Sequence, residues 1–341
     1  ARQELFRRLN MAPGGTQTLV EMRRQLLRGL KQHPAWSAID ADLLHLFRSW
    51  FNRGFLHLER IDWRTSAMVL EKLIQYEAVH AVQGWPDLRR RLEADRRCFG
   101  FFHPQLPDEP LIFIEVALTR GLSAQVQPLL EVTSQVASPA QADCAIFYSI
   151  TNCQEGLRGI SFGNLLIKQV AEDLKREFPH LRTFATLSPI PGLRRWLAQT
   201  ETRVQLSMGP NAEHRLALLS AIDQPGWHSG AVPEALQKLL MRLCAWYLLH
   251  ARQGAEPLDA VSRFHLGNGA ALERLNWLGD TSESGMARSA GMMVNYIYRL
   301  EDVERNHERY FADHAIVASR EVQKLARKSP LAATAEKRAE A

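Results

Sequence analysis

Residues 145–178 read AIFYSITNCQEGLRGISFGNLLIKQVAEDLKREF. The apolar run at the start predicts a short buried strand over Ala145–Ile150, and the spacing of apolar residues at the end predicts a helix over Asn164–Phe178. The loop between them carries glycines at positions 156, 159 and 163. Glycine lets the backbone approach a ligand closely, and the free N–H groups at a helix start favour a phosphate. The junction therefore predicts a site for a phosphorylated ligand.

The glycine spacing in this loop matches neither GxxxxGKS/T nor GxGxxG. A nucleotide-hydrolysing site and a Rossmann dinucleotide site are therefore both disfavoured. Arg158 in the loop and Lys168 in the following helix supply positive charge for an anionic ligand. A purely structural turn remains the alternative interpretation of this junction.

The first ~80 residues have helical periodicity. Thr18 and Glu21 form a capping-box pattern, after which Leu19, Leu26 and Leu30 fall on one helical face. A second helix is predicted to start at Ser37–Asp40, and a third over Thr65–Ala78. These segments carry no polar cluster that suggests chemistry, so they predict a packing or oligomerisation module.

The pattern changes from about Cys98 onward to alternating strands and helices. The other strands are predicted over Phe99–Phe102, Leu111–Leu118, Thr183–Leu187 and Met292–Tyr298. The other helices are predicted over Gly121–Val132, Glu213–Ile222, Pro233–Arg252 and Val303–Lys328. A helical block followed by mixed strands and helices predicts an α+β fold with a ligand at a strand–loop–helix junction.

Composition excludes several classes of protein. The 341 residues are 46% apolar and 23% charged, as in an ordinary globular protein, and the net charge is +5 without any long Lys/Arg block that would indicate a nucleic-acid binder. The longest apolar run, Leu243–Leu249, is far shorter than the ~20 residues of a membrane span. The first residues lack the apolar core of a secretion signal, which predicts a cytoplasmic location. The four cysteines form no CxxC pair, which predicts that the chain has no metal site.

Two segments carry candidate catalytic side chains. Ser188 follows a predicted strand and precedes two prolines, Pro189 and Pro191, which would hold its hydroxyl rigidly. The same serine could instead cap a helix over Leu193–Leu197. His265 is followed by Gly267-Asn268-Gly269, which offers backbone N–H groups near an imidazole, although a histidine at a helix end is the plainer interpretation.

Tyr296 and Tyr298 lie two residues apart on a predicted strand and so share one face. One of their hydroxyls could reach an active site, whereas packing is the alternative role. Gly159-Ile160-Ser161-Phe162-Gly163 satisfies the G-x-S-x-G pattern of a hydrolase nucleophile. Because about ten loop residues separate Ser161 from the end of the strand, a sharp strand-to-helix elbow is disfavoured there.

Several runs in this chain closely resemble the malonyl-CoA decarboxylase family. They are Phe147–Ile150, Gly156–Gly163, Glu177–Leu181, Leu187–Gly192, Phe264–Ala270 and Leu275–Trp277, followed by Met293, Asn295, Tyr296 and Tyr298. They occur in the family's order and span most of the chain from about Glu77. The resemblance implies a helical oligomerisation domain over residues 1–76 and, over 77–341, a mixed-sheet catalytic domain like that of the GNAT-type acetyltransferases, with helical insertions.

The resemblance also implies the site residues. Ser188 is implied as proton acceptor and His265 as proton donor, with Tyr298 in a supporting role and Asn268 in contact with the substrate. The implied CoA-binding residues are Arg158, Gly159, Ile160, Ser161, Phe162, Gly163 and Asn164, together with Ser188 and His265. The acetyltransferase pattern Q/R-x-x-G-x-G/A is not reproduced in register. The chain ends Arg-Ala-Glu-Ala, unlike the Ser-Lys-Leu-type signal of peroxisomal members.

The implied reaction converts malonyl-CoA to acetyl-CoA and CO2. The thioester carbonyl is itself an electron sink, so no metal, Schiff base or biotin is expected; the enolate needs hydrogen-bond donors and a proton. The alternatives are an acyl-CoA-dependent acetyltransferase of the same fold, a thioesterase using Ser161, and a scaffold that only senses acyl-CoA. Malonyl-CoA and acetyl-CoA are the expected ligands, and a homo-oligomer formed through the N-terminal helices is the expected assembly.

Overall fold

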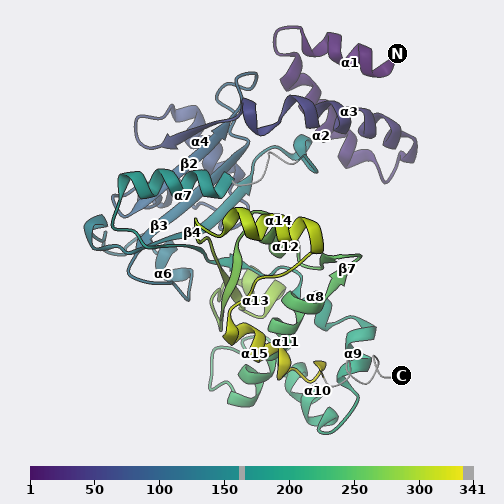
Figure 1. Ribbon diagram of the computed structural model, residues 1–341, viewed down its shortest axis with the longest axis vertical. Helices are drawn as coiled ribbons and strands as arrows, with labels where there is room; N and C mark the ends of the chain where they lie inside the picture. Colours follow the sequence, from purple (N-terminus) through teal and green to yellow (C-terminus); the bar gives the residue numbers. More distant parts are fainter. Residues whose placement is uncertain (161–165, 333–341) are drawn as a thin grey trace. The chain divides into compact units, whose positions relative to one another are not determined.

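The computed structural model describes residues 1–160 and 166–332, which form two compact units (Figure 1). The first unit contains Ala1–Leu118, Gln135–Gln141 and Phe147–Pro179. The second unit contains Thr119–Ser134, Ala142–Ile146 and His180–Ala341. Helices and strands are mixed, and the N-terminal region is helical, so the predicted α+β class is confirmed. In the described part of the chain, no helix is long and apolar enough to cross a membrane.

The helices of the first unit include the three predicted from periodicity. They are α1 (Arg2–Asn10), α2 (Gly15–Gly29), α3 (Ser37–Trp50), α4 (Ala67–Tyr76), α5 (Trp85–Arg91) and α7 (Leu166–Glu177). The predicted start of α2 at Thr18 was wrong. Gly14 occupies the N-cap at φ +69°, and the Thr18 hydroxyl donates back to the Gly14 carbonyl instead of capping the helix.

The strands of the first unit follow the order β1-β2-β3-β4, of which β4 begins in residues assigned to the second unit. They are β1 (His57–Ile61), β2 (Arg96–Phe102), β3 (Ile112–Thr119) and β4 (Cys144–Asn152). β1 pairs with β2 in antiparallel register, from His57↔Phe102 to Ile61↔Cys98. The sequence analysis missed β1, inside a range expected to be helical, because only Ile61 of this edge strand is buried and the apolar alternation is weak.

In the second unit β10 (Met293–Ile297) is the central strand. β9 (Ala271–Asn276) pairs along one edge of β10, while β5 (Thr183–Thr186) and the two-residue β6 (Ser188–Pro189) both pair with its other edge. A bulge between Asn295 and Tyr296 shifts the β9–β10 register. A separate hairpin joins β7 (Arg252–Gln253) to β8 (Glu256–Pro257). β9 was not predicted, whereas β5 and β10 confirm the predicted strands.

The helices of the second unit are α6 (Gln127–Leu130), α8 (Leu193–Leu197), α9 (Thr200–Leu206), α10 (Ala212–Ala221), α11 (Glu234–His250), α12 (Ala260–Gly267), α13 (Glu283–Ser289), α14 (Val303–Asp313) and α15 (Arg320–Arg327). Of these helices, α11, α12 and α15 pack on β9. The predictions for α10 and α11 are confirmed.

Two predicted helices in this unit were wrong in extent. Only Gln127–Leu130 of the predicted Gly121–Val132 helix is helical, and Gly121 lies at φ +68° outside it. The helix predicted over Val303–Lys328 is interrupted. His314 ends α14 in the left-handed region, Ala318 then forms a β-bridge with Leu272, and Ser319 caps α15. Pairing with β9 supplies hydrogen bonds that local helical periodicity does not reveal.

Candidate active site

Ser188 lies at the turn where the chain leaves β5 and joins the other half of the β10 edge. Its backbone pairs with Val294, and its side chain is 5% exposed. The predicted alternative, that Ser188 caps the next helix, was wrong because Gly192 occupies the N-cap of α8. The strand pairing and the flanking prolines hold Ser188 in place, as its sequence context indicated.

The Ser188 hydroxyl contacts two polar side chains. Oγ donates to Thr186 Oγ1 at 2.8 Å and lies 3.0 Å from His265 Nε2. Thr186 Oγ1 also accepts the backbone N–H of Tyr296 at 3.1 Å. Because a serine hydroxyl has one proton, an Oγ that donates to Thr186 is left to accept a hydrogen bond from Nε2–H of the imidazole.

His265 lies in the last turn of α12 and is 3% exposed. Its Nδ1 is 2.8 Å from the Tyr298 hydroxyl, and its ring stacks on Tyr296 at a centroid distance of 4.6 Å. Burial lowers the pKa of His265 to about 3, since desolvation disfavours the imidazolium ion. A neutral ring that accepts at Nδ1 from Tyr298 carries its proton on Nε2, on the side of Ser188.

Tyr298 follows β10 and is fully buried, with its backbone N–H bonded to the Phe184 carbonyl at 2.8 Å. Burial raises the pKa of its hydroxyl well above the usual value, so the phenol keeps its proton. The prediction that Tyr296 and Tyr298 share a face is confirmed, because one stacks on the His265 ring and the other contacts its Nδ1.

The Gly267-Asn268-Gly269 segment differs from its predicted role. The backbone N–H groups of Asn268, Gly269 and Ala270 bond to carbonyls of α12, and the Asn268 amide donates to the Phe264 carbonyl at 2.8 Å. They therefore close the helix that carries His265 rather than point free toward the imidazole. Gly269 adopts φ +82° and faces the Val303 carbonyl so closely that a Cβ would overlap it. Contact between Asn268 and a substrate stays a prediction.

A buried amide cluster behind Thr186 was not identified from the sequence as part of the site. Asn295 donates to the Thr186 carbonyl at 2.6 Å, and its own Oδ1 accepts from Asn276 at 2.9 Å and from Arg274 at 3.1 Å. All four residues lie on β5, β9 and β10. The partial signal in the sequence was the polar Asn295 inside an apolar strand, which indicates a hydrogen-bonded interior position.

The predicted CoA-binding loop belongs to the first unit. Buried Arg23 of α2 donates to the carbonyls of Gly156 at 2.8 Å and Arg158 at 2.9 Å. Gly156 has no room for a side chain, because a Cβ would overlap the Val20 carbonyl. Gly159 adopts φ +81°, which favours glycine there. The N-terminal helix α2 therefore holds the described part of the loop at Gly156 and Arg158, a contact that no local pattern predicted.

The structure describes only the first residues of the predicted CoA-binding loop. The Arg158 side chain is exposed, with its guanidinium 3.4 Å from Glu155, and Ile160 is buried. The other predicted CoA-binding residues, Ser161, Phe162, Gly163 and Asn164, lie outside the described residues. The G-x-S-x-G interpretation of Ser161 is untested for the same reason.

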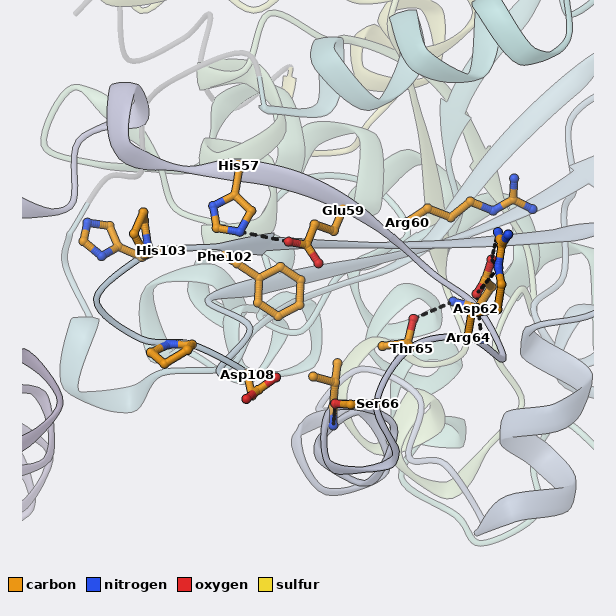
Figure 2. Close-up of a pocket in the computed structure, with 13 residues that line it drawn as sticks. His57, Glu59, Arg60, Asp62, Arg64, Thr65, Ser66, Phe102, His103 and Asp108 are labelled. Carbon is orange, nitrogen blue, oxygen red and sulfur yellow. Dashed lines mark hydrogen bonds and ion pairs between the residues drawn. The ribbon is translucent and has the colours of Figure 1, made fainter. Parts of the chain in front are cut away.

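A polar cavity of about 600 Å³ opens elsewhere on the first unit, beside β1 and the start of α4 (Figure 2). His57 and Glu59 pair across 3.0 Å in its wall, and Asp62 pairs with Arg64 at 2.7 Å. Among the described residues, none of those predicted for catalysis or CoA binding lines this cavity. This cavity is therefore separate from the predicted site residues that the structure describes.

Comparison with known families gives two matches that together cover almost the whole chain. The family model of the malonyl-CoA decarboxylase C-terminal domain matches residues 54–340, and that of the malonyl-CoA decarboxylase N-terminal domain matches residues 1–51. This division differs from the predicted domain boundary at residue 76, which stays a prediction.

Curated relatives and solved structures agree with the family matches. The mitochondrial malonyl-CoA decarboxylase of Anser anser anser is 40% identical over 93% of this chain and 68% of its own length, and that of Rattus norvegicus is 36% identical over 94% and 70%. The crystal structure of malonyl-CoA decarboxylase from Rhodopseudomonas palustris shares 52% identity with a TM-score of 0.90, over 95% of this chain and 79% of that one. The crystal structure of malonyl-CoA decarboxylase from Agrobacterium vitis shares 49% identity with a TM-score of 0.86, again over 95% of this chain and 79% of that one. Because both curated relatives are named as mitochondrial, the cytoplasmic location expected here stays a prediction.

Proposed function

The chain belongs to the malonyl-CoA decarboxylase family, a family of carboxy-lyases, and from this premise we propose that Ser188 and His265 are its catalytic pair and that no metal or organic cofactor takes part. The observation that carries the proposal is a buried chain of contacts, in which Ser188 Oγ lies 3.0 Å from His265 Nε2 and the Tyr298 hydroxyl lies 2.8 Å from His265 Nδ1. The two side chains whose roles the resemblance implied are thus hydrogen-bonded neighbours.

The reaction needs a stabilised enolate and a proton donor. When the bond between the carboxylate and the α-carbon of malonyl-CoA breaks, its electron pair moves into the thioester and CO2 leaves. Hydrogen-bond donors aimed at the developing oxyanion lower the barrier to this step. Delivery of a proton to the α-carbon then gives acetyl-CoA.

His265 is suited to deliver that proton from Nε2. Burial holds the ring neutral, and Tyr298 bonded at Nδ1 favours the tautomer with its proton on Nε2. A thioester enolate is a stronger base than an imidazolate, so transfer from neutral imidazole to carbon is favourable, and solvent reprotonates the ring afterwards. Tyr298 acts through His265 and is therefore a positioning residue.

Ser188 is suited to bind the departing carboxylate side of the substrate. Its hydroxyl donates to Thr186 Oγ1, and because a carboxylate only accepts hydrogen bonds, this donor turns from Thr186 to the substrate carboxylate when substrate binds. Oγ keeps the acceptor role toward His265 Nε2–H, which fits the implied proton acceptor. The rigid turn around Ser188 limits its freedom before substrate binds, which lowers the entropic cost of reaching a reactive geometry.

The thioester's CoA portion is assigned in this proposal to the loop 158–164, with Asn268 as a further contact. Arg158 is exposed and cationic, and Arg23 donates to the backbone carbonyls of Gly156 and Arg158. Phosphates are bound well by cationic side chains and by backbone N–H groups at glycine-rich turns.

Incubation of the purified chain with malonyl-CoA alone, in the presence of EDTA, tests the activity. Equal amounts of CO2 and acetyl-CoA are expected. Free CoA and malonate would instead indicate a thioesterase, for which Ser161 is the candidate nucleophile. Consumption of acetyl-CoA only with an added amine would indicate an acetyltransferase, and CoA binding without turnover would indicate a sensor.

Two substitutions test the catalytic pair. Ser188→Ala and His265→Asn are each expected to lower kcat by about 100-fold or more, the usual contribution of a general acid–base group, while leaving CoA binding intact. The exposed Ser220→Ala and His214→Asn are matched controls in the same unit and keep wild-type kcat. Near wild-type turnover in either catalytic variant would contradict the role assigned to that residue.

Self-association through the N-terminal helices is part of the same proposal. Leu5, Leu9 and Met11 of α1 and its end are 53%, 44% and 85% exposed, which leaves an apolar strip without cover in one copy of the chain. The double substitution Leu5→Glu/Leu9→Glu is expected to lower the molar mass measured by sedimentation velocity. An unchanged mass would contradict assembly through α1.

A further inference from the structure

The two catalytic side chains are carried by separate elements of the second unit. Four residues after Ser188, the chain reaches Gly192 at the start of α8, and the prolines at 189 and 191 stiffen the connection. His265 belongs to α12, whose N-cap is Asp259. The separation between Ser188 and His265 therefore depends on how the turn before α8 is held against the start of α12.

Asp259 contacts both of these elements. Its Oδ1 accepts the Ser262 backbone N–H at 2.9 Å, which caps α12, and its Oδ2 lies 3.4 Å from the hydroxyl of Tyr247 on α11. The Gly192 backbone packs beside the same carboxylate, since a Cβ built at Gly192 would lie 3.6 Å from Asp259 Oδ2. Asp259 is 1% exposed, and a buried carboxylate is costly unless such hydrogen bonds satisfy it. A serine would cap the helix equally well but would not reach the second element.

Gly192 is required here by space and not by backbone conformation. Its φ of −92° suits any residue, but a Cβ at this position would overlap the Tyr247 hydroxyl oxygen. The next nearest atoms are Tyr247 Cζ at 3.3 Å and Asp259 Oδ2 at 3.6 Å. The turn that carries Ser188 is thus packed directly on the Tyr247–Asp259 pair.

We propose that Asp259, supported by Tyr247, is a positioning residue that joins the Ser188 turn to the His265 helix and sets the distance between the two catalytic groups. This inference rests on the catalytic roles proposed above. Displacements of about 1 Å between reacting groups can cost about 100-fold in rate, so small movements of either element are expected to lower turnover. Substrate affinity is expected to change little, since the Asp259 side chain is 1% exposed and its hydrogen bonds go to protein groups.

Substitutions at Asp259 test the link. Asp259→Ala removes both connections and is expected to lower kcat about 10- to 100-fold with KM within about threefold of wild type. Asp259→Asn keeps one acceptor oxygen but places an N–H₂ donor where the second oxygen accepted a hydrogen bond. An intermediate loss of kcat is therefore expected. Ser319→Ala removes the equivalent cap from α15 and is the matched control, expected to lose stability without losing kcat.

A double-mutant cycle tests the packing without removing the carboxylate. Gly192→Ala is expected to lower kcat, because its Cβ displaces the Ser188 turn away from Tyr247. In Gly192→Ala/Tyr247→Phe the overlapping oxygen is gone, so at least tenfold of the lost kcat is expected to return. These variants keep Asp259, so the test remains decisive if Asp259→Ala does not fold.

The outcomes separate this inference from the proposed function. If Ser188→Ala abolishes turnover while Asp259→Asn and Gly192→Ala retain wild-type kcat, the link is wrong and the catalytic pair stands. If the effects of Gly192→Ala and Tyr247→Phe simply add, the packing argument is also wrong. If Ser188→Ala retains turnover, the proposed function itself fails.

Discussion

His265 makes the stability of this protein dependent on pH in a direction that its burial determines. In the folded chain the pKa of His265 is lowered to about 3, whereas an ordinary histidine has a pKa of 6.5. Below pH 6.5 the unfolded chain therefore binds a proton at this position and the folded chain does not. Because the unfolded state binds more protons, the free energy of unfolding falls as the pH falls from 6.5 toward 3.

The size of the effect follows from the difference between the two pKa values. Each pH unit below 6.5 costs about 1.4 kcal/mol until the folded protein also takes the proton. Between pH 7 and pH 5 the expected contribution of His265 is thus a loss of about 2 kcal/mol. Among the described residues the ring bonds to Ser188 and Tyr298 and not to a carboxylate, so no ionic partner there offsets this loss.

Urea denaturation of wild type and His265→Asn at pH 7 and pH 5 measures this contribution. The fall in the free energy of unfolding between the two pH values is expected to be about 2 kcal/mol smaller in the variant. Other titrating groups are common to both proteins and cancel in the difference. Substitution of the exposed His214 by Asn is the control for a His-to-Asn change outside the buried site. Equal pH dependence in wild type and His265→Asn would refute the buried, neutral state of His265.

Three further substitutions have expected kinetic signatures. Thr186→Val keeps the side-chain shape but removes the acceptor for Ser188, so kcat is expected to fall about tenfold with little change in KM, as measured with malonyl-CoA. Arg23→Ala leaves two loop carbonyls without their donor, so KM is expected to rise and urea denaturation to show a loss of about 1–3 kcal/mol; an unchanged KM would contradict its role in shaping the loop. Arg158→Ala is expected to raise KM about fivefold while kcat stays within twofold, and a selective loss of kcat would count against a binding role.

Much of the local structure could be predicted because its causes lie close together in the chain. The apolar spacing of α3, α10 and α11 follows from the helical period, and the strand–loop–helix junction from an apolar run followed by glycines. Ser188 was identified because the two prolines beside it restrict the backbone, and the shared face of Tyr296 and Tyr298 follows from the strand period.

The elements that were missed depend on partners far away in the chain. β1 is an edge strand with one buried residue, and it forms by pairing with β2 about 40 positions later in the chain. The break between α14 and α15 exists because Ala318 pairs with Leu272, 46 positions earlier in the chain, while the intervening sequence retains helical periodicity. The hydrogen bond from Arg23 to the Gly156 carbonyl joins residues that are 133 positions apart in the sequence. No local propensity encodes such contacts.

The sequence by itself determined which side chains are candidates for chemistry, since serine, histidine and tyrosine stand in restrained local settings that a single segment reveals. Only the tertiary structure decided that Ser188 and His265, 77 positions apart, lie within hydrogen-bond distance, and that Thr186 and Tyr298 fix their hydrogen-bonding roles. It also decided the protonation state of His265, because a pKa depends on the water and charges around a group and not on its neighbours in the chain.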